Sequence, residues 1–286
     1  MIIWLTSYPK SGNTLLRSML SAYFFTEDGK FNFDTIKKIN QFPDLKLFKN
    51  YGVNTSDQIE IVKNYINVQN KINEKDKNSV RFIKTHSGLS DINGHQFTNL
   101  KNSLGVIYMV RDPRSVVKSY ANHNQMTLER ASNRMLEYGA TLGGIKNSTN
   151  EVDKIITHMN SWSLNYESWK VFKKFDRYLL IKYEDIINNK EKVFLSILKF
   201  VHKLAKSKFS INEKKLKNIL ETTTFEYMQN LEKNKGFEES VNIQNNEKIV
   251  FFKYGPKVNT PESLAPKIKE KLEVSLKREM EELGYL

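Results

Sequence analysis

The chain has 286 residues and no cysteine, and its formal net charge is +13 at pH 7. This length is enough for one large domain or two small ones, and the lack of cysteine excludes a disulfide framework and a thiolate metal site. No apolar stretch approaches the ~20 residues that span a bilayer, and the N-terminus lacks the basic region of a signal peptide. We therefore expect a cytoplasmic protein without a membrane span.

The positive charge raises the question of a nucleic-acid partner. The lysines are scattered among asparagines and isoleucines, and no basic run is long. A solvated, lysine-rich surface explains most of this charge, so no nucleic-acid partner is expected.

Residues 2–25 predict a strand, a loop and a helix. Residues 2–5 are apolar and suit one buried strand, which ends before Pro9. Apolar residues then recur at helical spacing over residues 15–24. A loop that enters a helix directs unpaired N–H groups and the positive dipole end at one point, which is a natural anion site.

The loop between this strand and helix carries groups that suit an anion. Gly12 allows a close backbone approach, Thr14 can add a hydroxyl, and Lys10 brings a mobile positive charge. The loop is not a Walker A motif, because its lysine precedes the glycine and no Gly-Lys pair follows. It predicts phosphate or sulfate binding, with an ordinary strand–turn–helix as the alternative.

Residues 26–79 are polar and weakly patterned, with short helices expected near residues 31–39 and 59–68, and we expect them to shape an acceptor pocket. Residues 80–86 alternate between apolar and polar, which predicts a strand. This strand delivers Lys84 and His86 near its carboxyl end, where open α/β sheets place ligands. A lone histidine is more often structural than catalytic, so the residues alone leave both roles open for His86.

Residues 104–110 predict another strand, which ends at Arg111. Asp112 suits the cap of the following helix, and Pro113 suits its first turn. Arg111 and Ser119 are placed to bracket one phosphate, the first with a bidentate grip and the second with one hydroxyl. The alternative is an arginine paired with a carboxylate at a helix start.

The second half of the chain predicts a long helix over residues 153–172, a strand over 177–182 and a helix over 193–201. A short helix follows the threonines at 222–224, and a charged amphipathic helix runs from residue 260 to about 283. The polar stretch 234–246 is expected to form a mobile loop over the site.

Several of these stretches resemble motifs of the sulfotransferases, the enzymes that use 3′-phosphoadenosine 5′-phosphosulfate (PAPS). Tyr-Pro-Lys-Ser-Gly-Asn-Thr at residues 8–14 resembles their 5′-phosphosulfate loop. Arg-Asp-Pro-Arg-Ser-Val-Val-Lys-Ser at residues 111–119 resembles their 3′-phosphate motif, including the eight-residue gap from Arg111 to Ser119. Lys-Thr-His at residues 84–86 resembles the segment that carries the catalytic histidine.

Three further segments carry a weaker resemblance. Tyr183 begins a Tyr-Glu-Asp similar to the segment whose tyrosine reaches the nucleotide, and residues 223–228 are similar to the adenine-contacting Thr-Ser-Phe-x-x-Met. Residues 251–255 resemble the Phe-x-Arg-Lys-Gly segment that closes on the 3′-phosphate. Two departures stand out: Leu15 replaces the usual adenine-stacking tryptophan, and Lys253-Tyr254 replaces Arg-Lys, which removes a bidentate donor.

The resemblance implies a single sulfotransferase domain over residues 1–286. It implies a three-layer α/β fold with a central parallel sheet and a P-loop-like phosphosulfate loop, which binds PAPS and releases PAP (adenosine 3′,5′-bisphosphate) without a metal. It implies His86 as the catalytic base, with Lys10 and Lys84 as catalytic cations. The residues implied for PAPS binding are Lys10, Ser11, Gly12, Asn13, Thr14, Leu15, Arg111, Ser119, Tyr183, Thr223, Thr224, Phe225, Met228, Lys253, Tyr254 and Gly255.

The expected reaction is sulfuryl transfer from PAPS to a hydroxyl or amine of a small-molecule or carbohydrate acceptor. Two alternatives stay open: a P-loop nucleotide kinase or NTPase, although Gly-Lys-Ser/Thr is missing, and a non-catalytic module that binds nucleotide or nucleic acid through its basic surface. The sequence does not reveal the acceptor or the oligomeric state. Acceptor specificity is expected in residues 26–79, 88–102, 126–150 and 234–246, which carry no recognisable motif.

Overall fold

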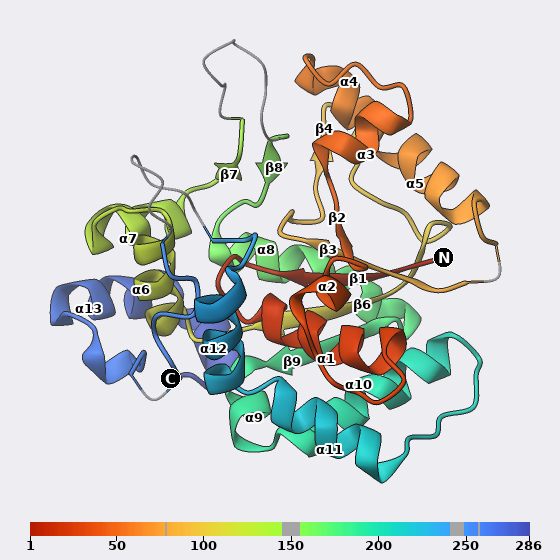
Figure 1. The fold of residues 1–286 in the computed structure, drawn as a ribbon. Helices are drawn as coiled ribbons and strands as arrows, with labels where there is room; N and C mark the ends of the chain where they lie inside the picture. Colours follow the sequence, from red (N-terminus) through yellow and green to blue (C-terminus); the bar gives the residue numbers. More distant parts are fainter. Residues whose placement is uncertain (78, 145–154, 241–248, 257) are drawn as a thin grey trace.

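The computed structural model describes residues 1–77, 79–144, 155–240, 249–256 and 258–286 (Figure 1). The strands are β1 (Ile2–Ser7), β2 (Asn40–Gln41), β3 (Arg81–Thr85), β4 (Asp91–Ile92), β5 (His95–Gln96), β6 (Ser103–Val110), β7 (Thr141–Leu142), β8 (Thr157–His158) and β9 (Tyr178–Lys182). The helices are α1 (Asn13–Phe25), α2 (Phe33–Ile36), α3 (Leu45–Asn50), α4 (Gln58–Lys63), α5 (Tyr65–Glu74), α6 (Pro113–His123), α7 (Leu128–Leu136), α8 (Trp162–Trp169), α9 (Tyr183–Asn188), α10 (Lys190–Leu204), α11 (Glu213–Thr222), α12 (Phe225–Lys235), α13 (Pro266–Ser275) and α14 (Lys277–Glu282), with 3₁₀ turns η1 (Lys170–Phe175) and η2 (Pro261–Ser263).

Strand β1 lies in the middle of a five-stranded sheet with the order β2-β3-β1-β6-β9. It pairs in parallel with β3 on one side and with β6 on the other, and the outer pairs β2·β3 and β6·β9 are parallel too. All five strands therefore end at the same edge, and the parallel α/β sheet expected from the sequence is confirmed.

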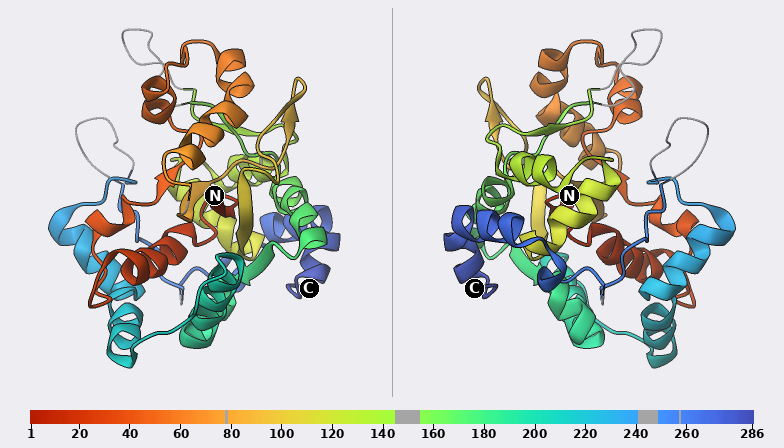
Figure 2. Two further views of the ribbon diagram at one scale, coloured as in Figure 1. Left: turned by 90° about the vertical axis from the view of Figure 1, so that its right-hand side faces the viewer. Right: turned by 90° about the vertical axis from the view of Figure 1, so that its left-hand side faces the viewer.

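The strands alternate between two hydrophobic cores, one on each face of the sheet. In β1, Ile2 and Trp4 belong to one core, whereas Ile3 and Leu5 belong to the other. This is the period-two alternation of a strand that is buried on both faces. Helices cover both faces (Figures 1 and 2), which makes the molecule the three-layer α/β fold that the sequence predicts.

The carboxyl ends of three strands lead directly into helices that border the site. The loop at residues 8–12 joins β1 to α1, Arg111 and Asp112 separate β6 from α6, and α9 follows β9 without a connecting loop. Asp112 caps α6 as predicted, since its Oδ1 accepts a hydrogen bond from the Arg114 amide at 2.8 Å. The polar residues that follow β1, β6 and β9 consequently gather at one edge of the sheet.

The long helix predicted over residues 153–172 is wrong. Residues 153 and 154 lie outside the described residues, and 157–158 form strand β8, which pairs antiparallel with β7. Helix α8 begins only at Trp162, because the Ser161 hydroxyl caps it by accepting the Leu164 amide at 3.2 Å. The aromatic residues that suggested one helix pack in the core from α8 and η1.

Two other predicted helices are each divided. The helix expected near residues 59–68 is interrupted at Asn64, whose side-chain amide donates to the Glu60 carbonyl at 2.8 Å and so ends α4. The helix expected over 260–283 becomes η2, α13 and α14. Pro266 holds Ala265 in an extended conformation, so α13 begins at the proline rather than at residue 260.

No helix in the described parts of the chain is both long and apolar enough to cross a membrane.

Candidate active site

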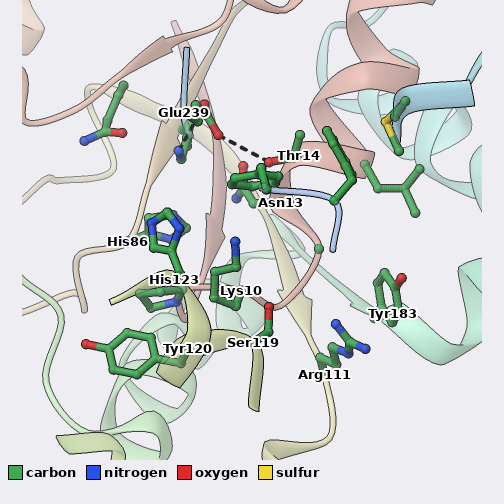
Figure 3. A pocket seen from close by; sticks show the side chains of 18 of the residues that line it. Lys10, Asn13, Thr14, His86, Arg111, Ser119, Tyr120, His123, Tyr183 and Glu239 are labelled. Carbon is green, nitrogen blue, oxygen red and sulfur yellow. Dashed lines mark hydrogen bonds and ion pairs between the residues drawn. The ribbon is translucent and has the colours of Figure 1, made fainter. Parts of the chain in front are cut away.

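A cavity of about 1120 Å³ lies at the carboxyl edge of the sheet (Figure 3). It is bordered by the loop after β1, by the ends of β3, β6 and β9, and by parts of α6 and α12. The predicted site residues that line it are Lys10, Gly12, Asn13, Thr14, Leu15, Lys84, His86, Arg111, Ser119, Tyr183, Thr223, Thr224, Phe225, Met228 and Tyr254. Ser11, Lys253 and Gly255 were predicted with them but do not line this cavity.

Gly12 has a conformation and a close neighbour that exclude a side chain. Its φ of 102° lies in the left-handed region. A Cβ built there would come within 2.6 Å of the Tyr183 ring. Gly12 therefore lets the loop after β1 pack directly against the first residue of α9.

The first turn of α1 carries no side-chain cap in the described structure. Asn13, which could have served, instead donates its amide to the Leu5 carbonyl at 3.0 Å and to the Ser7 hydroxyl at 3.3 Å. Helices α6 and α12, by contrast, are capped by Asp112 and Thr224. Residues 12–15 line the cavity, and among the described residues no side chain caps the leading N–H groups of α1, an arrangement that suits an anion.

Lys10 lies half-buried beside an aromatic ring. Its Nζ lies 3.6 Å from the centroid of the Phe251 ring. Burial is the main cause that lowers the pKa of Lys10 to about 7; Glu239 raises it, and the charges of Lys84 and Arg111 lower it further. The Lys10 side chain is therefore close to half protonated at neutral pH, and a nearby anion would favour its charged form.

His86 is held in one tautomer. Its Nδ1 lies 2.8 Å from the Ser7 carbonyl oxygen, which can only accept, so Nδ1 carries the proton and Nε2 keeps a lone pair. The backbone carbonyl of His86 accepts the Asn165 side-chain amide at 3.0 Å, which fixes the end of β3. Burial, followed by the charge of Lys84, lowers the pKa of His86 to about 3. The imidazole is accordingly neutral at physiological pH and able to accept a proton at Nε2.

Glu239 is a residue of this site that the sequence analysis missed. Its carboxylate forms an ion pair with Arg17, lies 3.4 Å from the Lys84 Nζ, and accepts the Thr14 hydroxyl at 3.3 Å. Burial alone would raise the pKa of Glu239, but the charges of Lys84 and Arg17 outweigh it and hold that pKa well below its usual range. The only sequence signal for Glu239 was its position in the polar stretch 234–246, of which residues 241–246 lie outside the described residues.

Arg111 and Tyr183 form a stacked pair at the other end of the cavity in the view of Figure 3. The Arg111 guanidinium carbon lies 4.2 Å from the centroid of the Tyr183 ring. Arg111 is buried, and among the described residues its Nε has no hydrogen-bond partner, while Nη2 only reaches the Asn259 carbonyl at 3.5 Å. Ser119 lines the same cavity. A buried guanidinium with an unused donor suits a bound phosphate.

The predicted adenine segment reaches the cavity, although its hydroxyls also have local partners. Thr224 caps α12 by accepting the Tyr227 amide at 3.1 Å, and Thr223 donates to the Ile219 carbonyl at 2.6 Å. Both hydroxyl oxygens retain acceptor capacity. Phe225 and Met228 add an apolar wall to the same part of the cavity.

The last predicted segment contributes only in part. Lys253 points to the surface, where its Nζ donates to the Asn122 side chain at 3.1 Å. Gly255 packs on Phe225, because a Cβ there would lie 3.2 Å from the ring. Tyr254 lines the cavity, as does Phe251, which the sequence analysis did not assign to the site.

The sulfotransferase domain profile matches residues 2–284, nearly the whole chain. The chain belongs to the sulfotransferase family. Its identification as a sulfotransferase, and thus as an enzyme, is thereby confirmed. No curated protein matches the sequence significantly.

Solved structures share the fold of this sulfotransferase at low sequence identity. A mouse sulfotransferase, SULT7A1, complexed with PAP is similar with a TM-score of 0.53 and 16% identity, over 98% of this chain and 83% of the mouse chain. Retinol dehydratase in complex with retinol and PAP is similar with a TM-score of 0.57 and 15% identity, over 98% of this chain and 81% of that one. These likenesses support the fold assignment and leave the roles of individual residues to the geometry described above.

Proposed function

We propose that this sulfotransferase transfers the sulfuryl group of PAPS to a hydroxyl or amine of an acceptor, with His86 as the general base. One observation carries the proposal: a single cavity joins the uncapped start of α1, Lys10 and Lys84 to the Arg111–Ser119 pair. Two separate anion sites in one cavity match a donor that carries both a 5′-phosphosulfate and a 3′-phosphate. The PAP in the mouse sulfotransferase and retinol dehydratase complexes supports the same donor.

On the donor side, the N–H groups that open α1 and the Thr14 hydroxyl bind the 5′-phosphosulfate. Lys10 places its charge on the oxygen that bridges phosphorus and sulfur, where negative charge develops as the bond breaks. Lys84 supplies a second cation for the sulfuryl oxygens. In an in-line transfer of this kind, catalysis depends on positioning and on electrostatic stabilisation.

On the acceptor side, the Nε2 of His86 removes the proton from the attacking group. The hydrogen bond from Nδ1 to the Ser7 carbonyl orients the ring and supports the imidazolium that forms. Asn165 keeps the end of β3, and with it His86, in place from α8. The chain's own residues therefore supply donor binding, charge stabilisation and proton transfer.

The acceptor is proposed to enter from the part of the cavity lined by Pro43, Leu45 and Leu142. Two segments expected to set specificity, 26–79 and 126–150, contribute these residues, although 145–150 lie outside the described part of the chain. Residues 88–102 contribute none of the lining residues. Retinol and androsterone occupy retinol dehydratase structures, and a small-molecule acceptor is proposed here too.

The donor assignment is tested by the affinities of PAP and of 5′-AMP, measured by calorimetry. Wild type should bind PAP much more tightly than AMP, because AMP lacks the 3′-phosphate. A charge-assisted hydrogen bond contributes roughly 1.5–3 kcal/mol, so Arg111→Ala should lose that preference and leave AMP binding nearly unchanged. Arg177→Ala, at the opposite end of β9, is the control. Equal affinities of the wild type for both nucleotides would remove the 3′-phosphate site.

The reaction itself is tested by a screen of hydroxyl and amine acceptors with radiolabelled PAPS. Transfer of label, without a requirement for ATP, is the expected result. Magnesium-dependent ATP turnover without use of PAPS would instead favour a nucleotide kinase. A salt-sensitive affinity for duplex nucleic acid with no binding of PAP would favour a non-catalytic module.

A further inference from the structure

Arg111 and Tyr183 come from neighbouring strands at the point where the strands separate. The register of β6 and β9 ends with the pair Val110–Lys182. Beyond this pair, β6 leads into α6 and β9 leads into α9, so no backbone hydrogen bond of the sheet keeps Arg111 beside Tyr183. Another contact must maintain the stacking of the guanidinium on the ring.

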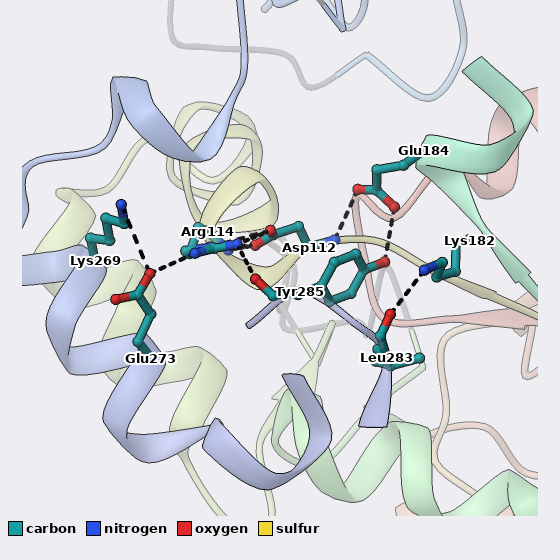
Figure 4. Close-up of polar contacts among 8 residues, drawn as sticks. All are labelled: Asp112, Arg114, Lys182, Glu184, Lys269, Glu273, Leu283 and Tyr285. Atoms are coloured by element: carbon teal, nitrogen blue, oxygen red, sulfur yellow. Dashed lines mark hydrogen bonds and ion pairs between the residues drawn. The ribbon is translucent and has the colours of Figure 1, made fainter. Parts of the chain in front are cut away.

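Glu184 provides this contact (Figure 4). One of its carboxylate oxygens accepts the backbone N–H of Asp112 at 3.1 Å. Asp112 follows Arg111, and Glu184 follows Tyr183. The hydrogen bond therefore joins the segment after β6 to the start of α9, directly next to the stacked pair. The Glu184 side chain thus adds one hydrogen bond between the segments that follow β6 and β9, just beyond the last strand pair.

The second oxygen of Glu184 is held by Tyr285, near the C-terminal end of α14. The Tyr285 hydroxyl donates to it at 2.9 Å. Burial, with a further contribution from Glu184, raises the pKa of Tyr285 far above its usual value, so the phenol keeps its proton and remains a donor. Neither Glu184 nor Tyr285 lines the cavity.

Tyr285 is itself fixed from the other side. Its backbone carbonyl accepts the Arg114 Nη2 at 2.8 Å. The same guanidinium contacts Asp112, with 2.6 Å between Nη2 and Oδ2, and forms an ion pair with Glu273. Figure 4 shows the resulting closed ring of contacts, which runs from Asp112 through Glu184, Tyr285 and Arg114 back to Asp112.

We propose that Glu184 and Tyr285 are positioning residues for the recognition of the nucleotide 3′-phosphate. They hold the backbone at Asp112 beside α9, so that Arg111 stays stacked on Tyr183 at the cavity wall. This inference rests on the proposed function, because it requires that Arg111 binds the 3′-phosphate. It extends the donor site to two residues that touch neither nucleotide nor acceptor.

The decisive variant is Tyr285→Phe, which removes one hydroxyl and keeps the ring. The hydroxyl acts on Arg111 only indirectly, through Glu184 and the Asp112 backbone, so we expect only part of the value of this hydrogen bond to reach PAP and its affinity to fall about three- to tenfold. AMP affinity should stay unchanged, because AMP has no 3′-phosphate for Arg111. In kinetics, the KM for PAPS should rise while kcat changes little. Glu184→Ala should show a larger change of the same kind.

The matched control is Tyr166→Phe, which also removes a tyrosine–glutamate hydrogen bond to the C-terminal helices. The Tyr166 hydroxyl donates to Glu282 at 3.1 Å, and among the described residues neither of these two forms a hydrogen bond with Asp112 or Glu184. This variant should keep the wild-type ratio of PAP to AMP affinity at a similar loss of thermal stability. An equal loss of the ratio in Tyr166→Phe, or a parallel weakening of PAP and AMP in Tyr285→Phe, would overturn the inference.

The experiment also separates this inference from the proposed function. A wild type that does not prefer PAP over AMP contradicts the 3′-phosphate site and the inference together. A wild type that prefers PAP, with the same preference in Tyr285→Phe, contradicts the inference alone. If Glu184→Ala fails to fold, the Tyr285→Phe ratio decides the result.

Discussion

Burial lowers the pKa of both Lys10 and His86 and so favours the neutral form of each, with different consequences for their roles. For Lys10 it weakens the cation in the ligand-free protein, since the pKa is about 7. For His86 it preserves the neutral base, since the pKa is about 3. The same low-polarity surroundings thus prepare one group to take up a proton with the donor and keep the other ready to accept a proton from the acceptor.

Lys10 should couple donor binding to proton uptake. At pH 8 the Lys10 side chain of the ligand-free protein is mostly deprotonated. The phosphosulfate or 5′-phosphate anion raises the pKa of Lys10 on binding. PAP binding at pH 8 should therefore be accompanied by net proton uptake, measured by calorimetry in buffers of different ionisation enthalpy. In Lys10→Arg the guanidinium stays charged, so uptake should disappear. Proton release, or uptake that persists in Lys10→Arg, would assign the effect to another group.

His86→Ala should reduce kcat by ~10²–10⁴, the usual contribution of a positioned proton acceptor. Its PAP affinity should change little, because the imidazole serves the acceptor. Since the pKa of His86 is lowered, protonation requires a pH well below 6.5, and the wild-type kcat should stay flat from pH 8 to about 6. The measurement is kcat against pH at saturating substrates, with His95→Ala as the control. Full activity in His86→Ala would contradict the role of His86 as base. An acid limb near pH 6.5 that is lost in His86→Ala would contradict only the lowered pKa, and a limb that persists in this variant would belong to another group.

Glu239 should compete with the donor for its cations. Its carboxylate lies among Arg17, Lys84 and Thr14, where an anion of the donor is proposed to bind. Glu239→Gln removes this charge with little change of shape, so PAP affinity should rise by about threefold or more. Glu238→Gln is the matched control, since its carboxylate pairs with the exposed Lys37. Weaker PAP binding in Glu239→Gln would instead show that the carboxylate holds the cations in place.

At the scale of elements, the site depends on the contact between the β1–α1 loop and the start of α9. Gly12→Ala should strain the backbone and force the Tyr183 ring aside, and we expect PAP affinity to fall about tenfold or more. Gly94 has a similar positive φ but nothing within 4 Å of an added Cβ, so Gly94→Ala isolates the backbone strain. Calorimetry and thermal unfolding of both variants check the prediction. Equal effects on PAP binding would show that the ring contact is unimportant.

The elements predicted correctly have local causes. Strands β1 and β6 are short apolar runs, and α6 begins at a capping aspartate followed by proline. The helix predicted over residues 153–172 is wrong because the limits of its elements depend on a tertiary contact. The hydrophobic spacing of residues 153–172 suits one helix, yet residues 157–158 pair with β7 instead. Residues 157–158 form a strand, although the spacing of their segment suits a helix, because they pair with β7 from another part of the chain.

At the scale of the whole molecule, one cavity is lined by residues from Pro9 to Pro256. We accordingly propose that the chain unfolds as a single domain and that PAP stabilises all of it. Calorimetry should show one transition whose Tm rises with PAP, since a ligand at 100 times its Kd adds about 2.7 kcal/mol of stability. Two transitions, of which only one responds to PAP, would contradict a single domain.

The sequence by itself determined the parallel α/β fold, the loop between β1 and α1 and the strand ends that carry His86 and Arg111. The loop and the strand ends rest on neighbouring residues, because a strand, a loop and a helix start are encoded within about ten positions. The parallel fold was implied by the resemblance of the motifs to those of the sulfotransferases. The order of the motifs along the chain was enough to identify a sulfotransferase.

Only the tertiary structure decided which other residues reach these groups. Glu239 meets Arg17 across 222 positions, and Tyr285 meets Glu184 across 101. Lys253, expected at the 3′-phosphate, turns to Asn122 at the surface instead. No local pattern encodes such contacts, because they depend on how the folded chain returns to the carboxyl edge of the sheet. The pKa values of Lys10 and His86 follow from the same packing, since burial is their main cause.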